Sequence, residues 1–201
     1  MEKKIQSKAV VHNSLGLQAL FQRLQDDITY QILELGPVRK GNIEFWTRFS
    51  NSIYVADLRS CLPLPPLPPP PEDDEETQER DWHQLLGLPE ERHFDIILAW
   101  DLPNYLDLSD LSGLIGYLSR FCRRETILFM LIFDNQKMRE DPAVYQIVDE
   151  SHLGYQLGGA KMRNCPRHHA HTLTQMMRRF RSADSFRLRN GVIEYLFIYE
   201  G

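Results

Sequence analysis

Residues 30–58, with the sequence YQILELGPVRKGNIEFWTRFSNSIYVADL, constrain the fold more than any other part of this chain. They predict a strand ending near Glu34, a turn at Gly36, a helix over 43–49 with apolar residues at helical spacing, and a second strand ending at Asp57. In open α/β sheets, ligands bind in the crevice outside the carboxyl ends of parallel strands. An acid about twenty residues beyond a glycine turn is placed to accept hydrogen bonds from ribose hydroxyls. The segment therefore predicts half of a nucleotide-type cofactor site.

This segment resembles the first motif of the class I S-adenosylmethionine-dependent methyltransferases, which is a hydrophobic strand, an acid and then spaced glycines. Glu34 and Gly36 match the start of that motif, and Gly41, followed by Asn42, stands as a late glycine. Asp57 matches the acid that holds the cofactor ribose in this family. The resemblance implies S-adenosylmethionine as the cofactor and these five residues among those that bind it.

The sequence departs from the family motif at residues 37–40, which read PVRK where further glycines are usual. A backbone without side chains can approach a ligand closely, whereas Val38 and Arg39 hinder that approach. The departure favours a second hypothesis, in which the fold is kept but the cofactor site is degenerate.

The rest of the chain predicts an α/β fold with a doubly wound, mostly parallel sheet. Strands alternate with helices at a spacing typical of βαβ units. We expect four apolar runs to lie side by side as parallel strands: ITYQILEL, SIYVADL, FDIILAW and TILFMLIF. A C-terminal antiparallel hairpin is expected over 185–200, because Asn190-Gly191 is a strong hairpin turn. The resemblance implies the same closure of the sheet.

Helical spacing or capping residues predict helices over five further stretches, and glycine with proline predicts a loop. The helices are expected at 9–24, 81–88, 108–122, 143–152 and 171–180, and the loop at 154–167.

We expect residues 1–201 to form a single methyltransferase-like domain, interrupted by a proline- and acid-rich insertion at about 62–80. Such a composition builds neither a core strand nor a core helix. It fits a stiff surface spacer, or a polyproline ligand for an aromatic groove. It also stands where the family has its third strand, which is therefore expected to be missing.

Polar residues follow the two later strands. Asp101, with Asn104 and Tyr105, is expected either to line the cofactor pocket, as the resemblance implies, or to cap the next helical turn. Asp134 and Asn135 are either a second part of that rim or an ordinary turn.

A cysteine and three histidines lie close together in sequence: Cys165, His168, His169 and His171. Zinc sites present two well-spaced ligand pairs, so no metal site is predicted here. The group is either a substrate loop with a histidine as general base or a polar surface loop.

Charge distribution and cysteine content limit which partners and which cellular compartment are expected. The net charge is −5, with acids concentrated over 72–110 and bases over 161–189. The basic segment lacks interleaved aromatics, so nucleic acid is possible but not favoured as a partner. No apolar run is long enough to span a membrane. The unevenly spaced cysteines, Cys61, Cys122 and Cys165, favour a reducing cytoplasm over a disulfide framework.

Three functions remain open from the sequence. The first is a methyltransferase that uses S-adenosylmethionine on an unknown acceptor, with no catalytic residue predicted. The second is a degenerate methyltransferase fold that acts as a binding or scaffold module. The third is another Rossmann-type nucleotide or NAD protein, which the absence of Gly-x-Gly-x-x-Gly disfavours.

Overall fold

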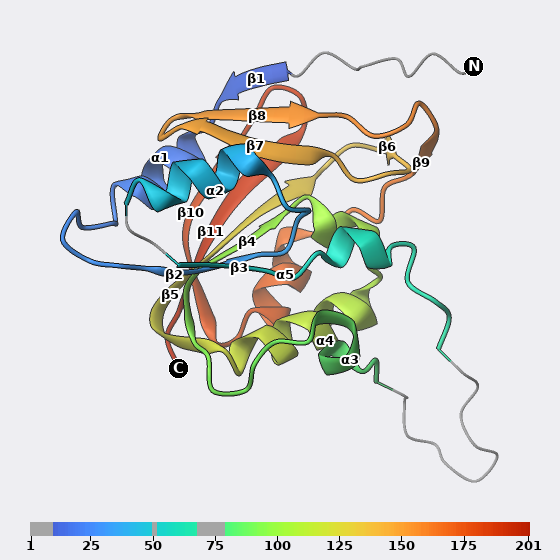
Figure 1. Cartoon of the computed structure of the whole chain (residues 1–201). Helices are drawn as coiled ribbons and strands as arrows, with labels where there is room; N and C mark the ends of the chain where they lie inside the picture. The colour runs from blue at the N-terminus through green and yellow to red at the C-terminus, as the bar shows by residue number, and fades with distance from the viewer. Residues whose placement is uncertain (1–9, 50–51, 68–78) are drawn as a thin grey trace, which may run out of the picture.

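A computed structural model describes residues 10–49, 52–67 and 79–201. A six-stranded sheet lies between two layers, with helices α3, α4 and α5 on one side and α1, α2 and a small sheet on the other (Figure 1). In spatial order the strands are β10 (Phe180–Arg187), β11 (Val192–Tyr199), β5 (Cys122–Phe133), β4 (Phe94–Trp100), β2 (Gln31–Glu34) and β3 (Ser52–Val55).

The main sheet confirms the expected parallel core and its antiparallel closure. Strands β3, β2, β4 and β5 pair in parallel, and β11 pairs antiparallel with both β5 and β10. Gly191, with a φ of 81°, stands at the hairpin turn as predicted. The sheet is nevertheless mixed, and two smaller sheets are antiparallel, so parallel pairing describes its central part only. Among the described residues no strand pairs with the outer edge of β3. The missing third strand stays a prediction, because residues 68–78 lie outside the described ranges.

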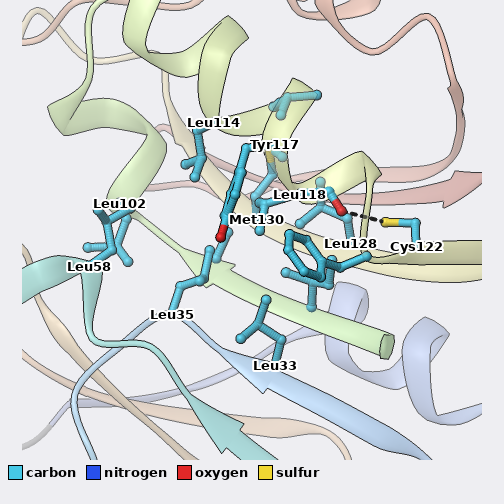
Figure 2. Close-up of a cluster of buried hydrophobic side chains, with 14 of the residues drawn as sticks. Leu33, Leu35, Leu58, Leu102, Leu114, Tyr117, Leu118, Cys122, Leu128 and Met130 are labelled. Carbon is cyan, nitrogen blue, oxygen red and sulfur yellow. Dashed lines mark hydrogen bonds between the residues drawn. The ribbon is translucent and has the colours of Figure 1, made fainter. Parts of the chain in front are cut away.

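One face of the sheet is covered by α3 (Trp82–Leu86), α4 (Leu108–Ser119) and α5 (Ala170–Met176), with the short 3₁₀ turns η1 (Leu58–Cys61) and η2 (Leu102–Tyr105). Figure 2 shows the core beneath them, where leucines of β2 and α4 meet Met130 of β5. Fully burying such a side chain contributes about 1.5–3 kcal/mol. This layer fixes the sheet, and hence the position of its carboxyl edge.

The other face is covered by α1 (Leu15–Phe21), α2 (Lys40–Thr47) and a three-stranded sheet of β1 (Val10–Asn13), β8 (His152–Gln156) and β7 (Val144–Asp149). Ser14 caps α1, with its Oγ accepting from the Leu17 N–H at 3.0 Å. Aromatic side chains of α1 and α2 pack together, including Phe21 stacked on Trp46 at 5.2 Å. The small sheet lies over the same face in Figure 1.

Three sequence predictions are wrong in this region. The helix expected at 143–152 is strand β7, whose Tyr145 and Ile147 are buried while their neighbours are more exposed. That alternation is the strand period, and the strand is held by antiparallel pairing with β8. The loop expected at 154–167 contains part of β8 and also β9 (Met162–Asn164), which pairs with β6 (Lys137–Arg139). The helix expected from residue 9 begins only at Leu15, after β1.

The central part of the proline- and acid-rich insertion, residues 68–78, lies outside the described residues, so the spacer hypothesis and the single-domain boundary stay predictions. Its flank is not a detached spacer, because Leu62 and Leu64 pack against the core. No helix in the described ranges is long and apolar enough to cross a membrane. The three cysteines are unpaired.

Candidate functional site

Glu34, at the carboxyl end of β2, is enclosed by protein donors. Its Oε1 accepts hydrogen bonds from the Gly36 N–H at 3.0 Å and from the Trp100 indole, and its Oε2 accepts from Asn42 Nδ2 at 3.1 Å. The residue is only 3% exposed. Burial raises the pKa of Glu34 to about 7, although these donors oppose the shift. Both carboxylate oxygens are therefore already satisfied.

Trp100 fills the space above the glycine turn. It ends β4 with a φ of 50°, a rare conformation for a bulky residue, and its ring stacks on Tyr145 of β7 at 5.3 Å and 9°. A Cβ added to Gly36 would lie 2.8 Å from Glu34 Oε1 and 3.0 Å from Trp100 Cδ1. The backbone approach that the glycine permits is thus taken up by an indole ring of the same chain.

Asn42 and Gly41 face β7 rather than open space. Asn42 Oδ1 accepts from the Ile147 N–H at 2.8 Å, and its Nδ2 also lies 3.4 Å from the Tyr145 carbonyl oxygen. A Cβ added to Gly41 would collide with the side chain of Gln146. The structure therefore brings Asn42 to Glu34, and both Asn42 and Gly41 lie against β7.

Asp57 is a predicted cofactor residue whose side chain stays partly accessible. Its Oδ1 accepts from the Ser60 N–H at 3.2 Å and caps η1, and the side chain is half-buried. Its negative charge contributes to the raised pKa of Glu34, so the two acids lie near each other at the ends of adjacent strands. This arrangement matches the layout expected from the sequence.

Asp101 follows Trp100 and is also buried, with 1% exposure. Its Oδ2 accepts from the Ala143 N–H at 3.0 Å, whereas Oδ1 has no hydrogen-bond partner among the described residues. Burial raises the pKa of Asp101 to about 7; the Ala143 N–H opposes this, and so does the Tyr145 hydroxyl, which lies close without meeting hydrogen-bond geometry. The side chain does not cap the following turn, so the capping interpretation is wrong.

Asn104, by contrast, is a structural residue. Its Nδ2 donates to the carbonyl oxygens of Asp101 and Leu131, each at 2.8 Å, and its Oδ1 accepts from the Phe133 N–H at 2.8 Å. It locks η2 to the end of β5.

Beside Asp101 lies a cavity of about 200 Å³ at the carboxyl ends of β4 and β5. The small strands cover it, and aromatic and aliphatic side chains dominate its wall. Its lining includes His12, Asp101, Tyr105, Leu131, Phe133, Lys137, Met138, Arg139, Tyr145, Tyr155 and Met162. Apolar cavities with a few convergent polar groups and a perturbed pKa are candidate ligand sites.

Asp134 and Asn135 serve the turns around them. Asp134 accepts from Arg187 at 2.6 Å and from Arg167 at 3.3 Å, and these partners lower its pKa. Asn135 Nδ2 donates to the Asn190 carbonyl at 2.9 Å, across the hairpin turn. The Asp134 side chain is therefore engaged in ion pairs, whereas Asn135 bonds across the hairpin turn and also lines the cavity beside Asp101.

The Cys165 and histidine group does not converge. His168 is buried, with Nε2 2.9 Å from the Pro103 carbonyl oxygen, and burial lowers its pKa. His169 and His171 are exposed, and no cluster of metal-ligating residues occurs in the described part of the chain. His168 therefore packs the loop onto η2.

Sequence reasoning missed Trp100, Tyr145 and His12. The tryptophan directly after the buried run FDIILA was a usable signal, because a large ring at a strand's carboxyl end must occupy the crevice. Tyr145 and His12 carry no such signal, since they come from strands that the sequence did not reveal.

No protein-family model and no curated protein matches this sequence. Several solved structures of related shape are methyltransferases. One, an S-adenosylmethionine-dependent methyltransferase from Clostridium acetobutylicum ATCC 824, is 10% identical, with 92% of this chain and 91% of that chain covered and a TM-score of 0.47. Another, the 1,6-didemethyltoxoflavin-N1-methyltransferase of Burkholderia thailandensis, is 14% identical, covering 92% and 75%, with a TM-score of 0.49. Likeness at this level says nothing about the ligand or reaction of this chain.

Proposed function

We propose that this chain is a binding protein built on a Rossmann-like, methyltransferase-type fold, with the cofactor crevice closed. The observation that carries the proposal is the Trp100 indole, which donates to Glu34 and lies against Gly36. The residues at this crevice do not fit S-adenosylmethionine, because their polar atoms bond to one another and the space above the glycine turn is filled.

Displacing Trp100 would be costly, because its side chain is only 2% exposed. Losing the packing of a buried tryptophan costs about 3–5 kcal/mol. A micromolar ligand gains about 8 kcal/mol in total. A cofactor that displaced the ring would therefore lose roughly half of its binding free energy, before the unpaired Glu34 carboxylate is considered.

Isothermal titration calorimetry tests the proposal with S-adenosylmethionine, S-adenosylhomocysteine and NAD. We expect no saturable heat from the wild type with any of the three up to about 1 mM, a limit that corresponds to about 4 kcal/mol. A micromolar Kd for either sulfur compound would contradict the closed crevice.

Methyl transfer from S-adenosylmethionine, the cofactor named for the methyltransferase neighbours, is the second candidate. It is favoured by the half-buried Asp57, which stands beside Glu34 where a ribose acceptor is expected. If the wild type binds the cofactor, Asp57→Ala should weaken binding about tenfold or more, because hydrogen bonds to charged groups contribute about 1.5–3 kcal/mol. Asp57→Asn is the matched control for folding, since asparagine also caps helical turns.

A further inference from the structure

The cavity beside Asp101 is separate from the closed crevice. Tyr145 lines the cavity on one side and stacks on Trp100 on the other, so the stacked pair forms the wall between them. The cavity wall combines the ends of β4 and β5 with side chains from β1, β6, β7, β8 and β9. A ligand here would not require Trp100 to move.

Two buried polar atoms on this wall lack partners within the described ranges. They are Asp101 Oδ1 and His12 Nδ1. His12 is otherwise held by Glu194, whose Oε1 lies 3.3 Å from His12 Nε2. An acceptor buried without a donor is unfavourable, and a ligand that supplies the donor removes that penalty. The carboxylate oxygen calls for an N–H or ammonium group.

The aromatic residues of the wall favour a ligand with an aromatic body and a positive charge. Tyr105, Tyr145, Tyr155 and Phe133 supply aromatic rings, and Leu131 an aliphatic surface. Aromatic faces attract cations, and they pack well against a planar ring.

The cations near the cavity do not neutralise Asp101 by direct contact. Lys137 is exposed, Arg139 donates to the Gly159 carbonyl at 2.9 Å, and Arg59 donates to the Pro142 carbonyl at 3.3 Å. Arg163 lies over the Tyr105 ring, 6.0 Å from its centre. An anionic ligand would have to face the buried carboxylate, which disfavours it.

We propose that this cavity binds a small primary or secondary arylalkylamine, with its ammonium group donating to Asp101 Oδ1 and its ring held among the tyrosines. The inference rests on the proposed function, because it names the ligand class of that binding protein. The volume of about 200 Å³ is below the usual range for drug-sized ligands, so the ligand is a compact one-ring compound.

Calorimetry with three isosteric probes tests the charge requirement. Phenethylamine supplies the cation, phenethyl alcohol a neutral donor and hydrocinnamate an anion. We expect phenethylamine to bind with a Kd of about 1 mM or tighter, and the other two at least about tenfold more weakly. Asp101→Asn should remove this preference, whereas Glu44→Gln, a change at an exposed α2 residue paired with Lys40, should keep it.

A second measurement needs no substitution. With ¹³C-methyl methionine in the wild type, phenethylamine should shift the signals of Met138 and Met162, which line the cavity. Met130 and Met177, which belong to the core on the other face of the sheet, should stay in place. Equal binding of amine and alcohol, no binding of any probe, or shifts confined to Met130 and Met177 would each overturn the proposal.

The two proposals fail in different experiments. Cofactor binding with no amine binding would overturn both the closed crevice and the amine site. Absence of binding by all cofactors and all probes would leave the closed crevice standing and overturn the amine site alone.

Discussion

Glu34 and Asp101 are two buried acids at the same edge of the same sheet, and burial raises the pKa of each to about 7. Glu34 has donors on both carboxylate oxygens. Asp101 has a donor on Oδ2 alone, and its other oxygen has no hydrogen-bond partner in the described part of the chain. The two acids are therefore similarly buried but differ in whether their hydrogen bonds are complete.

The difference lies in what covers each acid. Above Glu34, Trp100 and Asn42 supply hydrogen bonds to both carboxylate oxygens, so this carboxylate is part of the packed core. Asp101 instead faces a cavity. A buried carboxylate thus marks a candidate site only where its hydrogen bonds are left incomplete.

The largest expected effect comes from Trp100→Ala. The change removes a fully packed ring and one donor to Glu34, so the free energy of unfolding should fall by about 3–5 kcal/mol in urea denaturation. Tyr155→Ala, on the half-buried cavity wall, should cost less than about 2 kcal/mol. Similar losses from the two changes would mean that the crevice and the cavity are packed alike.

The pH dependence of stability gives the next effect. Because the folded-state pKa of each acid is raised above its ordinary value, 4.5 for Glu34 and 3.8 for Asp101, the folded protein binds more protons than the unfolded chain between about pH 4 and pH 7. The free energy of unfolding should therefore fall as pH rises from 5 to 7, by about 2–3 kcal/mol for each acid. Asp101→Asn should remove one of the two contributions. An Asp101→Asn variant whose stability falls as steeply as that of the wild type between pH 5 and pH 7 would show that the pKa of Asp101 is not raised.

The sequence predicted what local patterns encode. The apolar runs of β2, β4 and β5 mark buried strands wherever they occur, and Asn190-Gly191 specifies its own turn. The position of Glu34 and Asp57 at neighbouring strand ends follows from the same topology.

The remainder depends on contacts between distant segments. Strand β7 was predicted as a helix because its two inward residues are too few to decide between periods, and its pairing with β8 fixes the outcome. Whether Trp100 would fill the crevice depended on Tyr145, 45 positions further along and on a strand that was not predicted. Local sequence patterns thus specify the strands around this site. Which side chain fills the space between them is decided by packing between distant segments.

A pair of glycine substitutions gives the smallest expected changes in the free energy of unfolding, and the two changes should have opposite signs. In Gly36→Ala the new Cβ meets Glu34 Oε1 at 2.8 Å and Trp100 Cδ1 at 3.0 Å. Neither atom can move aside easily, because Oε1 is held by two hydrogen bonds and Cδ1 belongs to a buried ring. Overpacking of this kind costs about 1–3 kcal/mol. Gly116→Ala is the matched control, because Gly116 is exposed within α4 and its added Cβ meets nothing within 4 Å. Alanine there should stabilise by up to about 1 kcal/mol through helix propensity. If Trp100 swung freely out of the crevice, Gly36→Ala would be nearly neutral, so urea denaturation of the two variants decides whether the ring is a fixed part of the core.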